Sequence, residues 1–139
     1  MSYKIISKFI KDISFEIPDV ETFVTIEKEI TKYNLTFDIK SKPFKEKIVE
    51  VNTVLKILPT AEIKKKMLAE INLTSLVSIE KNITDKKELE KIVLVDVPKE
   101  IYPELYEIFV YLFTKAGVKN ITIAKEVDFL KMYNEKFKS

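Results

Sequence analysis

The chain has 139 residues, 46% of them hydrophobic, and a formal net charge of +2, which suits a single domain over residues 1–139 with one core. The lack of His and Cys excludes conventional zinc sites and His-activated nucleophiles, and a single Gly excludes Gly-rich phosphate-binding loops. The absence of Arg and the near balance of acids and lysines disfavour nucleic-acid binding.

The first predicted element is a strand from Tyr3 to Ile17. Most of its odd positions are apolar and include Phe9, while its even positions are mostly polar and include Lys8. Alternation with a period of two is typical of a strand with one buried face. The pattern therefore places Phe9 in the core, and it places Asp12 and Glu16 together on the polar face.

Three more strands follow at short spacing. The segment Asp19–Ile30 shows no regular period, and Tyr33–Lys40 then alternates until it meets the break Ser41–Pro43. The segment Ile48–Leu58 is rich in Val and Ile, and a fourth strand is predicted from about Lys66 to Ile79. Because the connections are too short for crossover helices, we expect an antiparallel sheet.

The last third of the chain changes to a helical period. After a polar loop or short helix at Asn82–Glu90, a helix is predicted to begin at Tyr102 and Pro103, with Pro at its first position. It ends near Lys115, and Gly117 provides its C-terminal cap. A short apolar connection at 121–124 precedes a final helix that begins near Asp128. Strands first and helices last indicate an α+β fold.

The longer helix is apolar on almost every side. A helix that covers one sheet face needs one apolar stripe, which here consists of Leu105, Ile108, Phe109, Leu112 and Phe113. Yet Tyr106, Val110 and Tyr111 are also apolar and lie outside that stripe. We therefore expect these three side chains to form an oligomer interface. The alternative is that the segment Asn82–Val97 folds over them within the same chain.

Three blocks of sequence resemble the SecB family of protein-export chaperones. They are Lys11–Glu16 (KDISFE) followed by Pro18, Val97–Pro103 (VPKEIYP) followed by Glu107 and Gly117, and Val127–Phe129 (VDF). Their order and spacing match the family over nearly the whole chain, whereas the middle of the chain matches in pattern alone.

The resemblance implies a fold and a function. The fold would be a four-stranded antiparallel sheet followed by two C-terminal helices, assembled as a homotetramer that is a dimer of dimers. The function would be that of an ATP-independent holdase, which binds unfolded preproteins in the cytoplasm and delivers them to the SecA motor. No enzyme activity, cofactor, metal or direct membrane insertion is implied. The longest apolar run, Ile108–Phe113, is indeed too short to span a membrane, and lysines interrupt the N-terminus where a signal peptide would need an apolar core.

The resemblance also implies two binding sites. Positions that match the SecA-binding patch are Asp12, Glu16, Leu68 and Glu70. Positions that match the client groove are Phe23, Val24 and Ile26, with Leu130, Tyr133 and Phe137 opposite them. The alternatives are a solvated sheet face with one incidental Leu for the first set, and ordinary core positions for the second.

The chain departs from the family pattern at several points. The segment between the first two strands is short and has no Trp, the residues Leu73–Leu76 replace a Gly pair in the fourth strand, and the net charge is not acidic. Two other functions therefore stay open. One is a SecB-like chaperone dedicated to an antitoxin of a toxin–antitoxin system, and the other is a structural or adaptor oligomer that binds no client.

Overall fold

The computed structural model describes residues 2–29, 33–59, 66–119 and 123–137. Strands and helices follow one another in the order β1 (Tyr3–Glu16), α1 (Val20–Glu29), β2 (Tyr33–Lys45), β3 (Ile48–Pro59), β4 (Leu68–Ile79), α2 (Lys86–Lys91), a π-helical turn η2 (Ile92–Asp96), α3 (Val97–Lys115) and α4 (Phe129–Phe137). The α+β prediction is therefore confirmed. No helix in the described ranges is long and apolar enough to cross a membrane.

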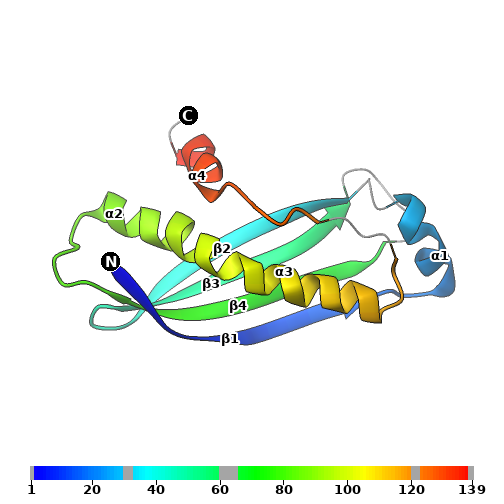
Figure 1. Ribbon diagram of the computed structural model, residues 1–139, viewed down its shortest axis with the longest axis horizontal. Helices are drawn as coiled ribbons and strands as arrows, with labels where there is room; N and C mark the ends of the chain where they lie inside the picture. Colours follow the sequence, from blue (N-terminus) through cyan, green and yellow to red (C-terminus); the bar gives the residue numbers. More distant parts are fainter. Residues whose placement is uncertain (1, 30–32, 60–65, 120–122, 138–139) are drawn as a thin grey trace.

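The described strands form one antiparallel sheet in the order β1-β4-β3-β2. Strands β2, β3 and β4 form a meander, whereas β1 pairs with β4 on the side of β4 opposite to β3. Both β1 and β2 are therefore edge strands. Figure 1 shows α2 and α3 running across one face of this sheet, and we call the opposite face the outer face. The predicted four-stranded antiparallel sheet is confirmed.

The crossover between β1 and β2 contains a helix that the sequence pattern did not predict. The side chain of Asp19 accepts hydrogen bonds from the backbone N–H and the hydroxyl of Thr22, at 2.8 and 2.6 Å, and so caps the N-terminus of α1. Thr22 and Ile26 are fully buried one turn apart. The helix was missed because its apolar residues do not form a regular stripe, although the Asp-x-x-Thr cap was visible.

Two irregularities in β1 reverse part of its predicted alternation. The register with β4 shifts between Ile5 and Ser7 and again between Ile10 and Asp12, so two β-bulges interrupt the strand. Between them Lys8 lies on the helix side, where its Nζ is 2.9 Å from a carboxylate oxygen of Glu104. The prediction that Phe9 belongs to the core is wrong: it lies opposite Thr74 on the outer face and is exposed.

The long helix begins earlier than predicted. Helical structure runs without a break from Lys86 through η2 into α3, and Pro103 lies inside α3 rather than at its first position. Pro103 is on the exposed side, where water can bond the carbonyl that the ring leaves without a partner. The predicted C-terminal cap is confirmed, because Gly117 adopts a φ of +92° directly after the helix.

Strand β2 also extends further than predicted. It continues through Pro43 to Lys45, where a register shift marks a third bulge. An edge strand tolerates Pro because one of its sides has no ladder partner. The predicted break at Pro43 is therefore wrong, and the hairpin to β3 turns instead at Glu46 and Lys47, the latter with a φ of 60°.

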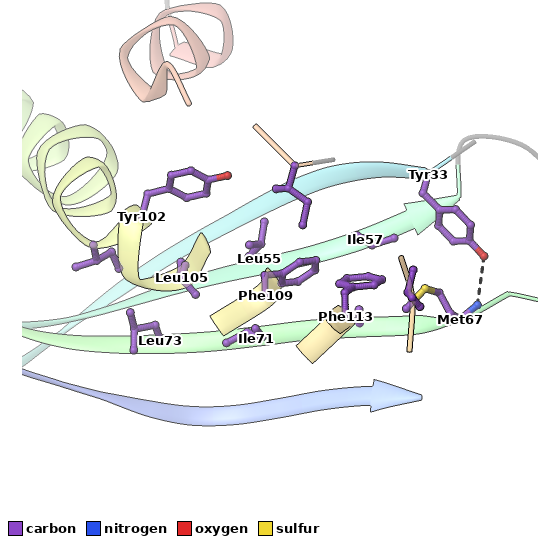
Figure 2. Packing of buried hydrophobic residues seen from close by; sticks show 14 of the residues in the cluster. Tyr33, Leu55, Ile57, Met67, Ile71, Leu73, Tyr102, Leu105, Phe109 and Phe113 are labelled. Atoms are coloured by element: carbon purple, nitrogen blue, oxygen red, sulfur yellow. Dashed lines mark hydrogen bonds between the residues drawn. The ribbon is translucent and has the colours of Figure 1, made fainter. Parts of the chain in front are cut away.

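The core lies between α3 and the sheet. Figure 2 shows Leu105, Phe109 and Phe113 of α3 pointing toward Leu55 and Ile71 of the central strands. All five side chains are at most 1% exposed, so the predicted core stripe of this helix is confirmed at these positions. Burial of several large apolar side chains provides most of the free energy that holds the helix on the sheet.

Two buried hydroxyls interrupt this core. Thr53 on β3 and Ser75 on β4 are fully buried on the helix side, and neither hydroxyl oxygen has a hydrogen-bond partner within the described part of the chain. Along the strands they separate a cluster around Leu55 and Leu73 from a second cluster around Val51 and Val77. A buried hydroxyl without a partner destabilises the folded state.

Candidate binding surfaces

The structure brings the four residues of the predicted SecA-type patch together on the outer face. Glu16 lies directly opposite Leu68 across the β1–β4 pair. Glu70 is two residues from Leu68 and Asp12 is four residues from Glu16, so both lie on the same face as this pair. Leu68 is 48% exposed, and Asp12 and Glu16 are exposed. An apolar side chain is therefore surrounded by carboxylates on a solvent-facing sheet.

The acids of this patch differ in their partners. The hydroxyl of Ser14 donates a hydrogen bond of 3.1 Å to Asp12. On β3, Lys56 lies directly opposite Glu70, and its Nζ is 3.8 Å from a carboxylate oxygen of Glu70. Lys56 was not among the residues predicted for this patch. Its polar position within the predicted third strand was visible, but the pairing register that places it beside Glu70 was not.

A hydrogen-bonded ladder of polar side chains continues from this patch along the outer face. The Asn52 amide donates to Glu50 at 2.8 Å, and the hydroxyl of Thr74 donates to the Asn52 carbonyl oxygen at 2.8 Å. The hydrogen bond from Asn52, assisted by the ammonium groups of Lys42 and Lys11, holds the pKa of Glu50 below its usual range. The middle of the outer face is therefore a fixed polar surface.

The predicted client residues on α1 divide into two groups. Phe23 and Val24 are 40% and 62% exposed, whereas Ile26 is buried and belongs to the core cluster. The ring of Phe23 reaches Gly117, just after the end of α3, so α1 packs at that end of the long helix. Phe23 and Val24 are therefore available at the surface, and Ile26 supports the helix that carries them.

The predicted client residues on α4 adjoin two hollows. Asp128 caps this helix as predicted, accepting a 2.9 Å hydrogen bond from the Lys131 N–H. Leu130 lines a cleft of about 910 Å³ between α3 and residues 125–130, and Tyr133 lines a hollow of about 130 Å³ beside β2. Phe137 is the last residue of α4, and its side chain lies outside the described part of the structure.

The aromatic ring of Phe129 separates these two hollows and lines both. It is buried, and its centroid lies 5.1 Å from that of Phe37 on β2 and 6.1 Å from that of Tyr102 on α3. The hydroxyl of Tyr133 donates a 3.3 Å hydrogen bond to Glu90, and burial and this carboxylate raise the pKa of Tyr133. The base of α4 is thereby fixed to the sheet and to α2.

A third hollow, of about 300 Å³, continues the row toward the β2–β3 hairpin. It lies between β2 and α2–η2, and it shares Leu94 with the 130 Å³ hollow. Its lining is largely aliphatic and includes Pro43, Leu89 and Val93. Two of the three hollows therefore lie beside edge strand β2, and the 910 Å³ cleft on the α3 side adjoins them through Phe129. This row of hollows was not predicted from the sequence.

The structure does not bring the two predicted halves of the client groove together. In Figure 1, α1 lies beyond one end of the sheet, and α4 lies above the middle of the long helix. Within the described residues of one chain, Phe23 and Val24 thus form one surface, and Leu130 and Tyr133 form another.

The predicted oligomer residues lie partly at the surface. Tyr106 and Val110 are half-buried against the core, whereas Tyr111 is 59% exposed, with the Nζ of Lys115 5.8 Å from its ring centroid. Edge strand β1 also has exposed apolar side chains, on both of its faces, and this exposure was not predicted. These side chains are Ile6, Phe9, Ile10 and Ile13.

Comparison with known proteins identifies relatives over nearly the whole chain. The family model "SecB: Preprotein translocase subunit SecB" matches residues 1–139. A protein of Pelagibacter ubique (strain HTCC1062), named "Putative protein-export protein SecB", is 46% identical over 135 residues, which cover 97% of this chain and 96% of that protein.

A solved structure shares the fold. It is the Rv1957 SecB-like chaperone of Mycobacterium tuberculosis in complex with a ChAD peptide from the Rv1956 HigA1 antitoxin. The TM-score is 0.68 at 12% sequence identity, over 91% of this chain and 88% of that one. Identity at this level supports the fold, and the described sheet and helices agree with it.

Proposed function

This chain belongs to the SecB family, and we propose that it is an ATP-independent chaperone that holds unfolded preproteins and delivers them to the SecA motor. Membership of the family carries the general role in protein export. The proposal adds the mode of holding, the receiving partner, the cytoplasm as the place of action, and a dimer of dimers as the working form.

The row of three adjoining hollows, which runs from the side of α3 to β2, is the observation that carries the proposal. An unfolded chain exposes apolar side chains at irregular spacing, so a holdase needs several adjacent apolar sites rather than one specific pocket. Here three hollows adjoin one another through Phe129 and Leu94. The outer side of β2 is an edge, where backbone groups remain available to an extended guest.

The outer face supports a second contact, with SecA. Its four patch residues lie on the side of the sheet away from α3, so client and motor can bind different faces at the same time. Carboxylates steer a positively charged partner, and exposed Leu68 supplies an apolar contact. This separation suits a protein that transfers one partner to another.

The exposed apolar residues of β1 and α3 support self-association. A soluble chain rarely leaves a row such as Ile6, Phe9 and Ile10 in water on an edge strand, because such an edge can pair with other chains. Pairing of two β1 edges and packing of two α3 helices would give two kinds of contact. A dimer of dimers requires such a pair of contacts.

Client holding can be tested with a matched pair of leucines. Leu130 lines the 910 Å³ cleft and is 45% exposed, whereas Leu58 is 44% exposed on β3 and lines none of the three described hollows. We expect Leu130→Ser to weaken binding of a permanently unfolded, carboxymethylated protein several-fold in a fluorescence anisotropy titration. Leu58→Ser should leave it unchanged. Equal affinity of the two variants, or no binding by the unaltered chain without nucleotide, would contradict the proposed holding function.

A further inference from the structure

The SecA-type patch contains an internal cation that the family resemblance does not assign. Lys56 and Glu70 lie directly opposite each other on β3 and β4, with 3.8 Å between Nζ and Oε1. Their side chains are 33% and 35% exposed, so both are reachable from solvent but partly screened from it by the sheet. Residues directly opposite each other on neighbouring strands are close enough for opposite charges to form a stabilising pair.

Within the described residues, neither of the remaining acids of the patch, Asp12 and Glu16, forms an ion pair. Asp12 accepts a hydrogen bond from the neutral hydroxyl of Ser14, and Glu16 lies beside the apolar Leu68 on the β1 side. The outer face therefore presents two different halves. The half on β1 carries two carboxylates without an ion pair in the described residues, and the half around Glu70 is paired with a lysine of the same chain.

This arrangement places Lys56 in competition with a partner. A cationic side chain that binds Glu70 must either displace the Lys56 ammonium group or lie close to it, and like charges at that range repel. Because a partly exposed ion pair is weak, the competition lowers the affinity but does not prevent binding. The most favourable site for a cationic side chain of the partner therefore lies between Asp12 and Glu16.

We propose that Lys56 is a specificity-determining residue of the outer face. By occupying Glu70, it weakens the association with a cationic partner and directs that partner's lysines or arginines toward the β1 edge. The inference rests on the proposed delivery to SecA, and it deepens it by naming the residue that limits the strength of that contact. A contact that is weaker than the acids alone would give also favours release after delivery.

The test compares two lysines on the same face of the sheet. Lys56→Gln and Lys40→Gln each remove one positive charge, but Lys40 lies on β2 and contacts Asp38 at 3.7 Å, outside the patch. Lys56→Met is a second variant that keeps the aliphatic stem, and thermal unfolding checks that all three remain folded. Affinity for purified SecA is measured by calorimetry at two salt concentrations.

We expect Lys56→Gln and Lys56→Met to bind SecA about two- to fivefold more tightly than the unaltered chain, with a steeper salt dependence. Lys40→Gln should bind like the unaltered chain. Equal affinities for the Lys56 and Lys40 variants, when Asp12→Lys still weakens binding, overturn the inference and leave the proposed delivery intact. Absence of SecA binding by every form overturns the delivery and the inference together.

Discussion

Glu16 on β1 lies directly opposite Leu68 on β4, so a carboxylate and an exposed apolar side chain occupy neighbouring positions on the outer face. This pairing joins the opening segment of the chain to its fourth strand, more than fifty residues away. It is the centre of the face that we assign to SecA.

Reversal of one charge beside this centre should weaken the contact with SecA. Asp12 is exposed and is a better position for this test than Glu70. A lysine at position 70 would lie directly opposite Lys56, and the repulsion between the two would complicate the result. We expect Asp12→Lys to lower SecA affinity about fivefold, with client binding unchanged. The matched control is Asp38→Lys, on the same face at the β2 edge, which should retain affinity. A control that weakens the contact equally would assign the effect to net charge.

Two buried threonines should respond in opposite directions to the same substitution. The hydroxyl of Thr53 has no described partner, whereas that of Thr74 donates to Asn52 at 2.8 Å. We expect Thr53→Val to raise the free energy of unfolding by about 1 kcal/mol, and Thr74→Val to lower it by about 1 kcal/mol. Urea denaturation followed by circular dichroism measures both. A loss of stability in the Thr53 variant would indicate that its hydroxyl is satisfied in solution.

Self-association should depend on the exposed side of α3. Size-exclusion chromatography with light scattering is expected to give about four times the 16.3 kDa mass of the chain. Tyr111 is 59% exposed, and Tyr111→Asp should reduce this mass to that of a dimer. The reason is that burying an unpaired carboxylate between subunits is costly. The control is Val20→Asp, at the exposed start of α1. A monomer at micromolar concentration for the unaltered chain would contradict the assembly.

The stability contributed by Glu50 should vanish in acid. Its pKa is lowered from the usual 4.5, chiefly by the hydrogen bond from Asn52, so the folded state favours the carboxylate. A lowered folded pKa contributes stability above pH 4.5, and the contribution is lost as the pH falls through the folded value. We expect Glu50→Gln to lower the free energy of unfolding at pH 7, and we expect this difference from the unaltered chain to disappear as the pH falls through the lowered pKa of Glu50. Glu46→Gln, at the exposed hairpin turn, should differ little at either pH.

The sequence was sufficient to predict that four strands exist and roughly where they lie, because most of their alternation is a local property, although β2 continues past Pro43. The first residue of α4 and the glycine cap of α3 were likewise predicted from local signals, the side chain of Asp128 and the single Gly117. The positions of Asp12 and Glu16 on the outer face were also predicted correctly. The first bulge in β1 shifts the alternation, and the second bulge restores it before Asp12.

What the sequence did not predict depends on pairing between distant segments. The bulges that turn Phe9 outward and Lys8 inward exist because of the register with β4, and the partner of Glu70 is set by the register of β3. The start of the long helix was misplaced because Pro103 is tolerated inside α3 on its exposed side. The three adjoining hollows are lined by segments distant in the sequence, none of which shows a binding pattern alone.

The order of the strands also bears on how the chain reaches this structure. The meander β2-β3-β4 pairs neighbours in sequence, but Tyr3 at the start of β1 pairs with Ile79 at the end of β4. Because distant pairings close long loops and form slowly, we expect β1 to join the sheet last during synthesis. Until the ribosome has released β4, the first strand and its exposed isoleucines remain an unfolded apolar segment, of the same kind that the finished protein is proposed to hold.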